Sequence, residues 1–318
     1  MRTRKWVLIG VAVLALGSVA YVGVAGFLLA RVSAQILTVG ALAQALGEAP
    51  RPDDPLALGY RGDPQTALGL PFQAVPIDTP LGAAEAWMVE AGIGDGLAAI
   101  YVHGIAGARE DGYRHLTMLH EAGIPTLLIS YRTDPDAPVS PDAVYSFGLS
   151  EWADLQAAVD WMRARGNDRL LIVAESMGGG ILGQFLRQSP QSGSVAAIAL
   201  DSPAVDFQAV LAHLARQRDL PLADAIGGSA AQWLALRGPV DLRQARVADI
   251  YTGFPGPLFI AHGAGDRIVP LAPSQSLAAA RTQPTVTLFT QADHLQSWHE
   301  DPARYRAAFT AFLDSLPR

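Results

Sequence analysis

The sequence of 318 residues contains no cysteine. This absence excludes disulfides, thiolate metal sites and a cysteine nucleophile, and it fits a protein outside the cytoplasm. Basic residues are also scarce: 23 lysines and arginines stand against 30 aspartates and glutamates, which leaves a net charge of -7. These cations form no long patch that could follow a phosphate backbone, so the composition argues against nucleic acid as a partner.

The rest of the composition is that of a globular protein. Hydrophobic residues make up 50% of the chain and charged residues 17%, and the length allows one large domain or two small ones. The mean hydropathy of +0.21 partly reflects a strongly apolar N-terminus. There is no internal repeat and no low-complexity segment.

Residues 6–30 form a run without a charge. In a helix, which rises about 1.5 Å per residue, this run is long enough to cross a hydrocarbon core of about 30 Å. Arg2, Arg4 and Lys5 precede it, and the positive-inside rule keeps such an end in the cytoplasm. Residues 1–30 are therefore predicted to be a single transmembrane anchor in the cell membrane, with the remaining chain on the extracytoplasmic side.

A cleaved signal peptide is the alternative for this N-terminus. Ser18, Val19 and Ala20 offer small residues of the kind found at cleavage sites, and the mature protein would then be secreted. The apolar region of a signal peptide usually has about 7 to 15 residues. The greater length of this run favours the anchor.

Residues 31–71 are predicted to be a stalk or linker arm. Helical spacing of apolar residues continues at first, and a series of prolines then forbids regular helix. These prolines are Pro50, Pro52, Pro55, Pro64 and Pro71. The segment is either a linker or an irregular arm that lies on the following domain.

Residues 72–318 are predicted to form an α/β domain. The chain first shows the pattern of a β-hairpin, with a turn at residues 79–82, and then alternates apolar strands with helices. Strands are expected at 98–102, 126–131, 170–174, 195–200, 258–261 and 285–289, and helices at 113–122, 151–164, 178–187, 273–281 and 302–313. This alternation predicts a mostly parallel, doubly wound sheet with helices on both faces.

One segment interrupts the alternation. Residues 204–249 contain two helical patterns, at 207–216 and 222–236, with no strand between them. We interpret this segment as a helical cap inserted into the domain.

Residues 170–180 carry the strongest local signal. Five apolar residues predict a buried strand, and helical spacing begins after the glycines at 178–180. Ser176 thus lies at a sharp strand-to-helix turn, which requires small residues two positions before and after it, and Ala174 and Gly178 meet this requirement. Such a turn is typical of a nucleophilic serine, although the first position is more often glycine.

A serine nucleophile needs a base and a group that orients the base. In a doubly wound sheet, loops at the carboxyl ends of later strands open at the same edge as the serine turn. Asp266 follows one late strand and His294 follows the last. The three residues occur in the order serine, acid, histidine.

These stretches together resemble the alpha/beta-hydrolase superfamily, within its membrane-anchored, serine-aminopeptidase-like or esterase-like bacterial branch. The matching stretches are His103-Gly104, Ala174-Glu175-Ser176-Met177-Gly178-Gly179, His262-Gly263-Ala264-Gly265-Asp266-Arg267-Ile268-Val269-Pro270 and Asp293-His294. The resemblance implies Ser176 as nucleophile, His294 as general base and acid, and Asp266 as the orienting carboxylate. It also implies an oxyanion hole made by the backbone N–H groups of Met177 and Ile105, and no cofactor.

Other residues allow alternative assignments. Asp201 ends another strand at the same edge and is the rival for the orienting acid. His103 is expected to shape its loop, and Asp293 to cap the loop beside His294. The remaining histidines are expected to be core or helix residues, and their scatter predicts no metal site. Residues 131–134 and 145–148 are expected to border the pocket or to have a structural role.

The sequence therefore predicts a membrane-tethered serine hydrolase. It would cleave a carboxylic ester, thioester or amide through an acyl-enzyme, with an esterase-like or lipase-like activity favoured. Its partner would be a small-molecule or lipid-like acyl substrate, because a cap and an anchor favour apolar substrates. A serine peptidase of the same fold and a tethered binding protein without activity are the alternatives.

Overall fold

The computed structural model describes residues 2–47, 50–92 and 96–316. Its centre is a sheet of eight strands in the order β1-β2-β4-β3-β5-β6-β7-β8. β2 is antiparallel to both of its neighbours, β1 and β4, and every neighbouring pair from β4 to β8 in this order is parallel. The strands are β1 Gln73–Thr79, β2 Gly82–Val89, β3 Leu97–Val102, β4 Thr126–Ile129, β5 Arg169–Glu175, β6 Val195–Asp201, β7 Leu258–Gly263 and β8 Thr285–Thr290. The predicted hairpin and the mostly parallel sheet are confirmed.

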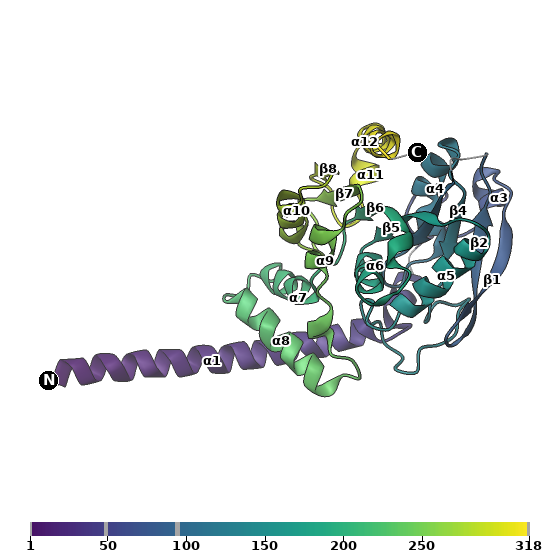
Figure 1. Cartoon of the computed structure of the whole chain (residues 1–318). Helices are drawn as coiled ribbons and strands as arrows, with labels where there is room; N and C mark the ends of the chain where they lie inside the picture. Colours follow the sequence, from purple (N-terminus) through teal and green to yellow (C-terminus); the bar gives the residue numbers. More distant parts are fainter. Residues whose placement is uncertain (1, 48–49, 93–95, 317–318) are drawn as a thin grey trace.

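Helices cover both faces of the sheet (Figure 1). The larger apolar core contains α5 (Trp152–Ala164) and α6 (Met177–Gln188). The core on the other face contains α4 (Tyr113–Glu121) and α12 (Pro302–Asp314). Alternate residues of each central strand enter opposite cores, which explains why these strands are continuous apolar runs.

The cap lies between β6 and β7. It consists of α7 (Phe207–Arg216), α8 (Ala223–Arg237) and the short α9 (Ala248–Gly253). The Asp206 side chain begins α7 by accepting a hydrogen bond from the Ala209 N–H. α7 and α8 match the two helical patterns predicted in residues 204–249, whereas α9 was not predicted and extends past residue 249. The remaining helices are α2 Ala41–Gly47, α3 Pro64–Leu68, α10 Leu271–Ala280, α11 Ser297–Glu300 and three short 3₁₀ turns, Arg109–Gly112, Ser192–Ser194 and Leu242–Gln244.

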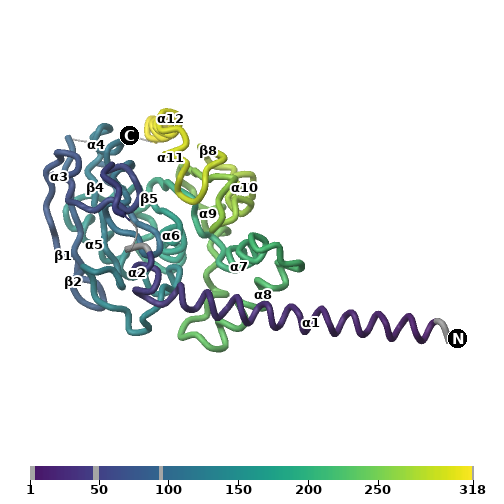
Figure 2. The backbone as a smooth tube through the Cα atoms, turned by 180° about the vertical axis from the view of Figure 1, so that it is seen from behind, coloured from purple at the N-terminus to yellow at the C-terminus, as the bar shows by residue number. Residues whose placement is uncertain are grey.

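Helix α1 (Arg2–Leu37) extends from the domain as a long rod (Figures 1 and 2). It continues past residue 30, where the sequence placed the end of the anchor. Its later turns pack against α8: the Phe27 ring lies 5.3 Å from the Trp233 ring. At Gly26 a Cβ atom would overlap the Ser229 side chain, so glycine permits the close approach of the two helices. Apolar residues that could face lipid here face the cap instead.

The arm after α1 lies on the domain rather than extending as a free stalk. Thr38 forms an antiparallel bridge with Val144, and the Tyr145 N–H donates to the Leu37 carbonyl. Further on, Leu56, Tyr60 and apolar residues of 67–72 pack against the core that contains α4 and α12. Residues 48 and 49 of this arm lie outside the described residues.

Candidate active site

The turn between β5 and α6 places Ser176 at φ 49° and ψ -117°, a positive φ that non-glycine residues rarely adopt. Gly178 follows where backbones meet: a Cβ atom there would lie 2.5 Å from the Val102 carbonyl oxygen and 2.8 Å from that of His103. Real Cβ atoms do not approach so closely. The turn therefore requires glycine at 178 and holds the serine in a strained conformation, as the motif predicts.

Ser176 and His294 meet at the carboxyl edge of the sheet. The His294 Nε2 atom lies 3.0 Å from the Ser176 Oγ, and its Nδ1 lies 2.7 Å from the Asp266 Oδ2. A proton on Nδ1, donated to the carboxylate, leaves Nε2 free to accept the serine hydroxyl hydrogen. The structure thus brings the three predicted residues into one hydrogen-bonded chain.

Hydrogen bonds fix the position of the Asp266 carboxylate and favour its ionised form. Its Oδ1 accepts the backbone N–H groups of Ile268 and Val269, both at 2.8 Å, and its Oδ2 lies 3.2 Å from the His262 Nε2. Burial acts to raise the pKa of the Asp266 carboxyl, but the hydrogen bonds from His262, His294 and the backbone outweigh it and hold the pKa below its ordinary value.

Asp201, the rival acid, has other partners. Its Oδ2 accepts the Tyr305 hydroxyl at 2.9 Å and lies 3.7 Å from the Arg114 guanidinium. The alternative that Asp201 orients His294 is therefore not supported by the geometry. Asp293 holds the loop, as expected, by accepting the backbone N–H groups of His294 and Arg267.

The two residues predicted to supply the oxyanion donors begin α6 and belong to the loop after β3. Met177 is the first residue of α6, so no carbonyl of its own helix accepts its N–H. Ile105 belongs to the loop after β3, in which Gly104 lies against Ser176: a Cβ atom on Gly104 would be 3.0 Å from the Ser176 Cβ. Ala106, the next residue, has a positive φ of 52°. The loop is thus bent tightly beside Ser176.

The His103 side chain contacts this loop and fixes its position. The side chain is buried, with Nδ1 2.8 Å from the Gly104 carbonyl and Nε2 2.9 Å from the Asp134 carboxylate. Its ring stacks on Tyr131 at 4.3 Å. Burial acts to lower the pKa of His103, but the Asp134 charge and the hydrogen bonds raise it above its ordinary value. This is the structural role that the sequence suggested.

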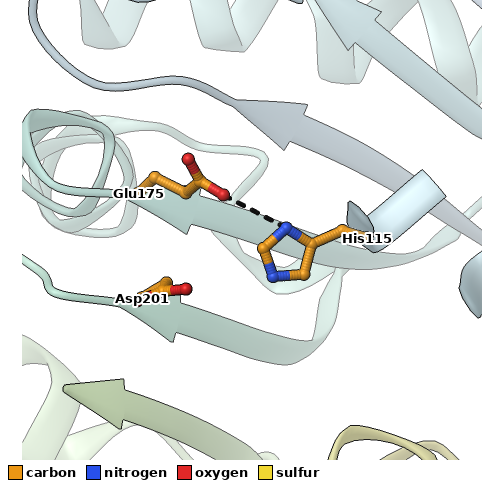
Figure 3. A group of neighbouring side chains, drawn as sticks. All are labelled: His115, Glu175 and Asp201. Carbon is orange, nitrogen blue, oxygen red and sulfur yellow. Dashed lines mark ion pairs between the residues drawn. The ribbon is translucent and has the colours of Figure 1, made fainter. Parts of the chain in front are cut away.

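A second buried cluster contains His115, Asp201 and Glu175, the residue immediately before Ser176 (Figure 3). The Glu175 carboxylate accepts the Arg114 guanidinium at 2.6 Å and the Tyr101 hydroxyl at 2.9 Å, and it lies 3.1 Å from the His115 Nδ1. Glu175, His115 and Asp201 are close enough to hold a metal ion. However, the Arg114 guanidinium already supplies the positive charge between the two carboxylates, so a cation would be repelled.

Sequence reasoning missed this cluster and one contact of the cap. His115 and His213 were expected to be ordinary helix residues. His115 instead belongs to the cluster, and the His213 Nε2 on α7 lies 2.8 Å from the Asp266 carbonyl oxygen. A signal for the cluster was present, because Glu175 is a charged residue at the end of the apolar run that forms β5.

The two segments expected to border the pocket have mainly structural contacts. The Arg132 guanidinium binds the buried Asp154 carboxylate at 2.7 Å. The Tyr131 hydroxyl donates to the Gly104 carbonyl at 3.0 Å, and the Ser146 N–H donates to the Glu151 carboxylate at 2.7 Å. These contacts support the loops around the serine.

The sequence was compared with those of known proteins. No model of a known protein family matches the sequence. The uncharacterized protein YfhR of Salmonella typhimurium is 25% identical over 230 residues, which cover 68% of this chain and 70% of YfhR.

Several solved structures are similar in fold. The esterase Pf2001 of Pyrococcus furiosus superimposes with a TM-score of 0.63 at 18% identity, over 84% of this chain and 96% of the esterase. A thermophilic esterase of Thermogutta terrifontis gives a TM-score of 0.55 at 18% identity, over 76% of this chain and 98% of that chain. XC6422 of Xanthomonas campestris, an α/β serine hydrolase without a lid, gives 0.52 at 16% identity, over 78% and 96%. The protein therefore has the alpha/beta-hydrolase fold, as the sequence motifs indicate.

Proposed function

We propose that the protein is a serine hydrolase that cleaves a carboxylic ester through an acyl-enzyme. The observation that carries this proposal is the hydrogen-bonded chain from Ser176 through His294 to Asp266, with distances of 3.0 and 2.7 Å. A serine hydroxyl is a poor nucleophile unless a base removes its proton, and this chain supplies an oriented base.

The reaction follows from the geometry. As Ser176 Oγ attacks the carbonyl carbon, its proton passes to His294 Nε2, and Asp266 stabilises the imidazolium. The imidazolium then protonates the leaving alcohol, which departs and leaves an acyl-serine. Water, activated by His294, releases the acid and restores Ser176.

Negative charge develops on the carbonyl oxygen during each attack. The N–H groups of Met177 and Ile105 are proposed to bind this oxygen, and each such donor is worth about 3 to 4 kcal/mol of transition-state stabilisation. The start of α6 adds a favourable helix dipole at the same point. Positioning of the loop by His103 would keep the Ile105 donor in place.

An ester panel with matched peptide amides tests this proposal. The detergent-solubilised protein should hydrolyse p-nitrophenyl esters faster than the corresponding peptide p-nitroanilides, and His294→Ala should lose about 10³-fold or more in kcat. His299→Ala is the matched control, because this neighbouring histidine has no place in the hydrogen-bonded chain, and it should keep its activity. Preferred cleavage of the anilides would favour the peptidase. Absence of hydrolysis of both series would favour the binding protein.

We further propose that α1 tethers the enzyme in the membrane, with the N-terminus cytoplasmic and the domain outside. The support is one helix, residues 4–37, that is long and apolar enough to cross a bilayer. The side chains become partly buried from Tyr21 onward, just after the alternative cleavage site at Ala20. Alkaline extraction and N-terminal sequencing separate the two: a tethered protein stays in the membrane with its first residues intact, whereas a cleaved one is released and begins near Tyr21.

A further inference from the structure

We propose that the tip of the cap, residues 217–222 between α7 and α8, contacts the lipid surface in which α1 is embedded. This inference depends on the proposed tether. It concerns a separate feature, namely a second membrane contact supplied by the hydrolase domain itself.

The first argument is the length of α1 that is free to face lipid. Residues 4–20 are exposed on all sides of the helix, whereas from Tyr21 one face is covered by the cap. Seventeen residues span about 25 Å, and a hydrocarbon core of about 30 Å needs about 20 residues. If α1 crosses a bilayer of ordinary thickness, the membrane must therefore extend into the part of α1 that carries the cap.

The second argument is the direction of α8. Gly26 lies against Ser229, Phe27 against Trp233, and Leu37 shares an apolar hollow with Leu234 and Gly238. In these contacts, residues later in α1 meet residues later in α8, so the two helices run in the same direction. The start of α8 therefore points toward the N-terminal end of α1, and both views of the backbone show the α7–α8 connection on that side (Figures 1 and 2).

This direction brings the tip to the level of the bilayer. From Ser229 back to Leu222 the helix covers about 10 Å along its axis. Elements that lie in the membrane interface are typically buried by about 5 to 10 Å. The tip consequently reaches the interfacial zone even if α8 is tilted relative to α1.

The chemistry of the tip suits that position. Leu222 is 54% exposed although it is a large apolar residue, and Pro221 beside it is also exposed. Arg218 and Asp219 within the tip are exposed, and Arg216 beside it is paired with Asp224. A long cationic side chain such as that of Arg218 can reach a lipid phosphate while its stem remains in the apolar region. The last turn of α7 also contacts the loop of Asp266 through His213. A membrane contact at the tip would hold the candidate active site close to lipid-borne esters.

The absence of cysteine permits a direct test. Single cysteines at Leu14, Leu222 and Leu236 are labelled with the polarity-sensitive fluorophore NBD in the full-length protein, which is then reconstituted in phosphatidylcholine–phosphatidylglycerol vesicles containing brominated lipid. Leu236 is the matched control, because it is 66% exposed but lies at the opposite end of α8. We expect blue-shifted emission and quenching at Leu222 at least about twofold stronger than at Leu236.

The three positions separate the possible results. Quenching at Leu14 but not at Leu222 would overturn the inference while leaving the tether intact. No quenching at Leu14, or loss of that residue from the mature protein, would overturn the tether and with it the inference. Emission at Leu222 that is blue-shifted but unquenched would indicate a protein contact, such as a second copy of the chain, and would also contradict the lipid contact.

Discussion

The Arg114 guanidinium lies 2.6 Å from the carboxylate of Glu175, the residue before Ser176, in a fully buried ion pair. Removing the cation would leave the carboxylates of Glu175 and Asp201 without a counter-charge. We therefore expect Arg114→Met to lower the free energy of unfolding by about 3 to 5 kcal/mol, measured by urea denaturation. The exposed Arg165–Glu90 pair is the control, and Arg165→Met should cost less than about 1 kcal/mol. Equal costs at the two sites would contradict this account of the cluster.

Asp266→Asn should lower kcat for a soluble ester by about 10⁴-fold, because an amide can no longer hold the proton of His294 on Nδ1. Circular dichroism and thermal unfolding show whether the variant is folded. Asp293→Asn should lose less than about tenfold, because this carboxylate binds backbone N–H groups and Arg267 rather than the imidazole. A larger loss of kcat from Asp293→Asn than from Asp266→Asn would show that Asp266 is not the carboxylate that orients His294.

Gly178→Ala should disrupt the nucleophile turn. The added methyl group would lie 2.5 Å from the Val102 carbonyl oxygen, so either the strand or the serine must move. We expect a loss of at least about 100-fold in kcat/KM, since small displacements of reacting groups are costly. Gly193→Ala adds the same methyl group in open space and should leave activity unchanged. Full activity in Gly178→Ala would show that the turn tolerates a side chain.

The His103–Asp134 pair predicts a pH-dependent contribution to stability. The pKa of His103 is raised in the folded protein, so its contribution is complete below the unfolded pKa of about 6.5 and is lost as the pH rises through the higher folded pKa. The difference in free energy of unfolding between the wild type and His103→Asn should therefore be largest in acid and shrink in alkali. A difference that does not change with pH would show that His103 stays neutral.

Gly26→Val should separate α1 from the cap, because any Cβ atom at this position overlaps Ser229. Overpacking of this kind costs about 1 to 3 kcal/mol. Hydrogen exchange of the α8 backbone should accelerate in this variant. Gly23→Val introduces the same residue on the same helix where no atom lies within 4 Å of the added Cβ, and it should leave α8 protected. Equal exchange in both variants would mean that helix propensity, rather than packing, causes the change.

The sheet and the nucleophile turn could be predicted because their signals are local. Five apolar residues before Ser176 predict the strand, and the small residues around Ser176 predict the turn, all within one short stretch. The positions of Asp266 and His294 followed from a geometric rule, since parallel strands end at one edge. The rule could not choose between Asp266 and Asp201, because Asp201 ends one strand at that edge and Asp266 follows another. Only the structure shows that Asp201 binds Tyr305 on α12.

The contacts that were not predicted join distant segments with no local pattern. Arg114 and Glu175 are 61 residues apart, and a histidine on a helix gives no indication that it will reach such a pair. The extent of the anchor was uncertain for a different physical reason. Apolar side chains between Tyr21 and Leu37 can face lipid or another helix, and the same hydropathy describes both. Gly26 allows the close approach of α8, but Gly10, Gly17 and Gly23 of the same helix have no neighbour within 4 Å, so a glycine in the sequence does not by itself mark the packing face.

Labelling with a fluorophosphonate tests the central claim most directly, because this reagent reacts preferentially with an activated serine. The account predicts one adduct per chain, located by peptide mass spectrometry on Ser176 and absent from Ser176→Ala and His294→Ala. A folded protein that remains unlabelled, or an adduct that persists in Ser176→Ala, would contradict the account.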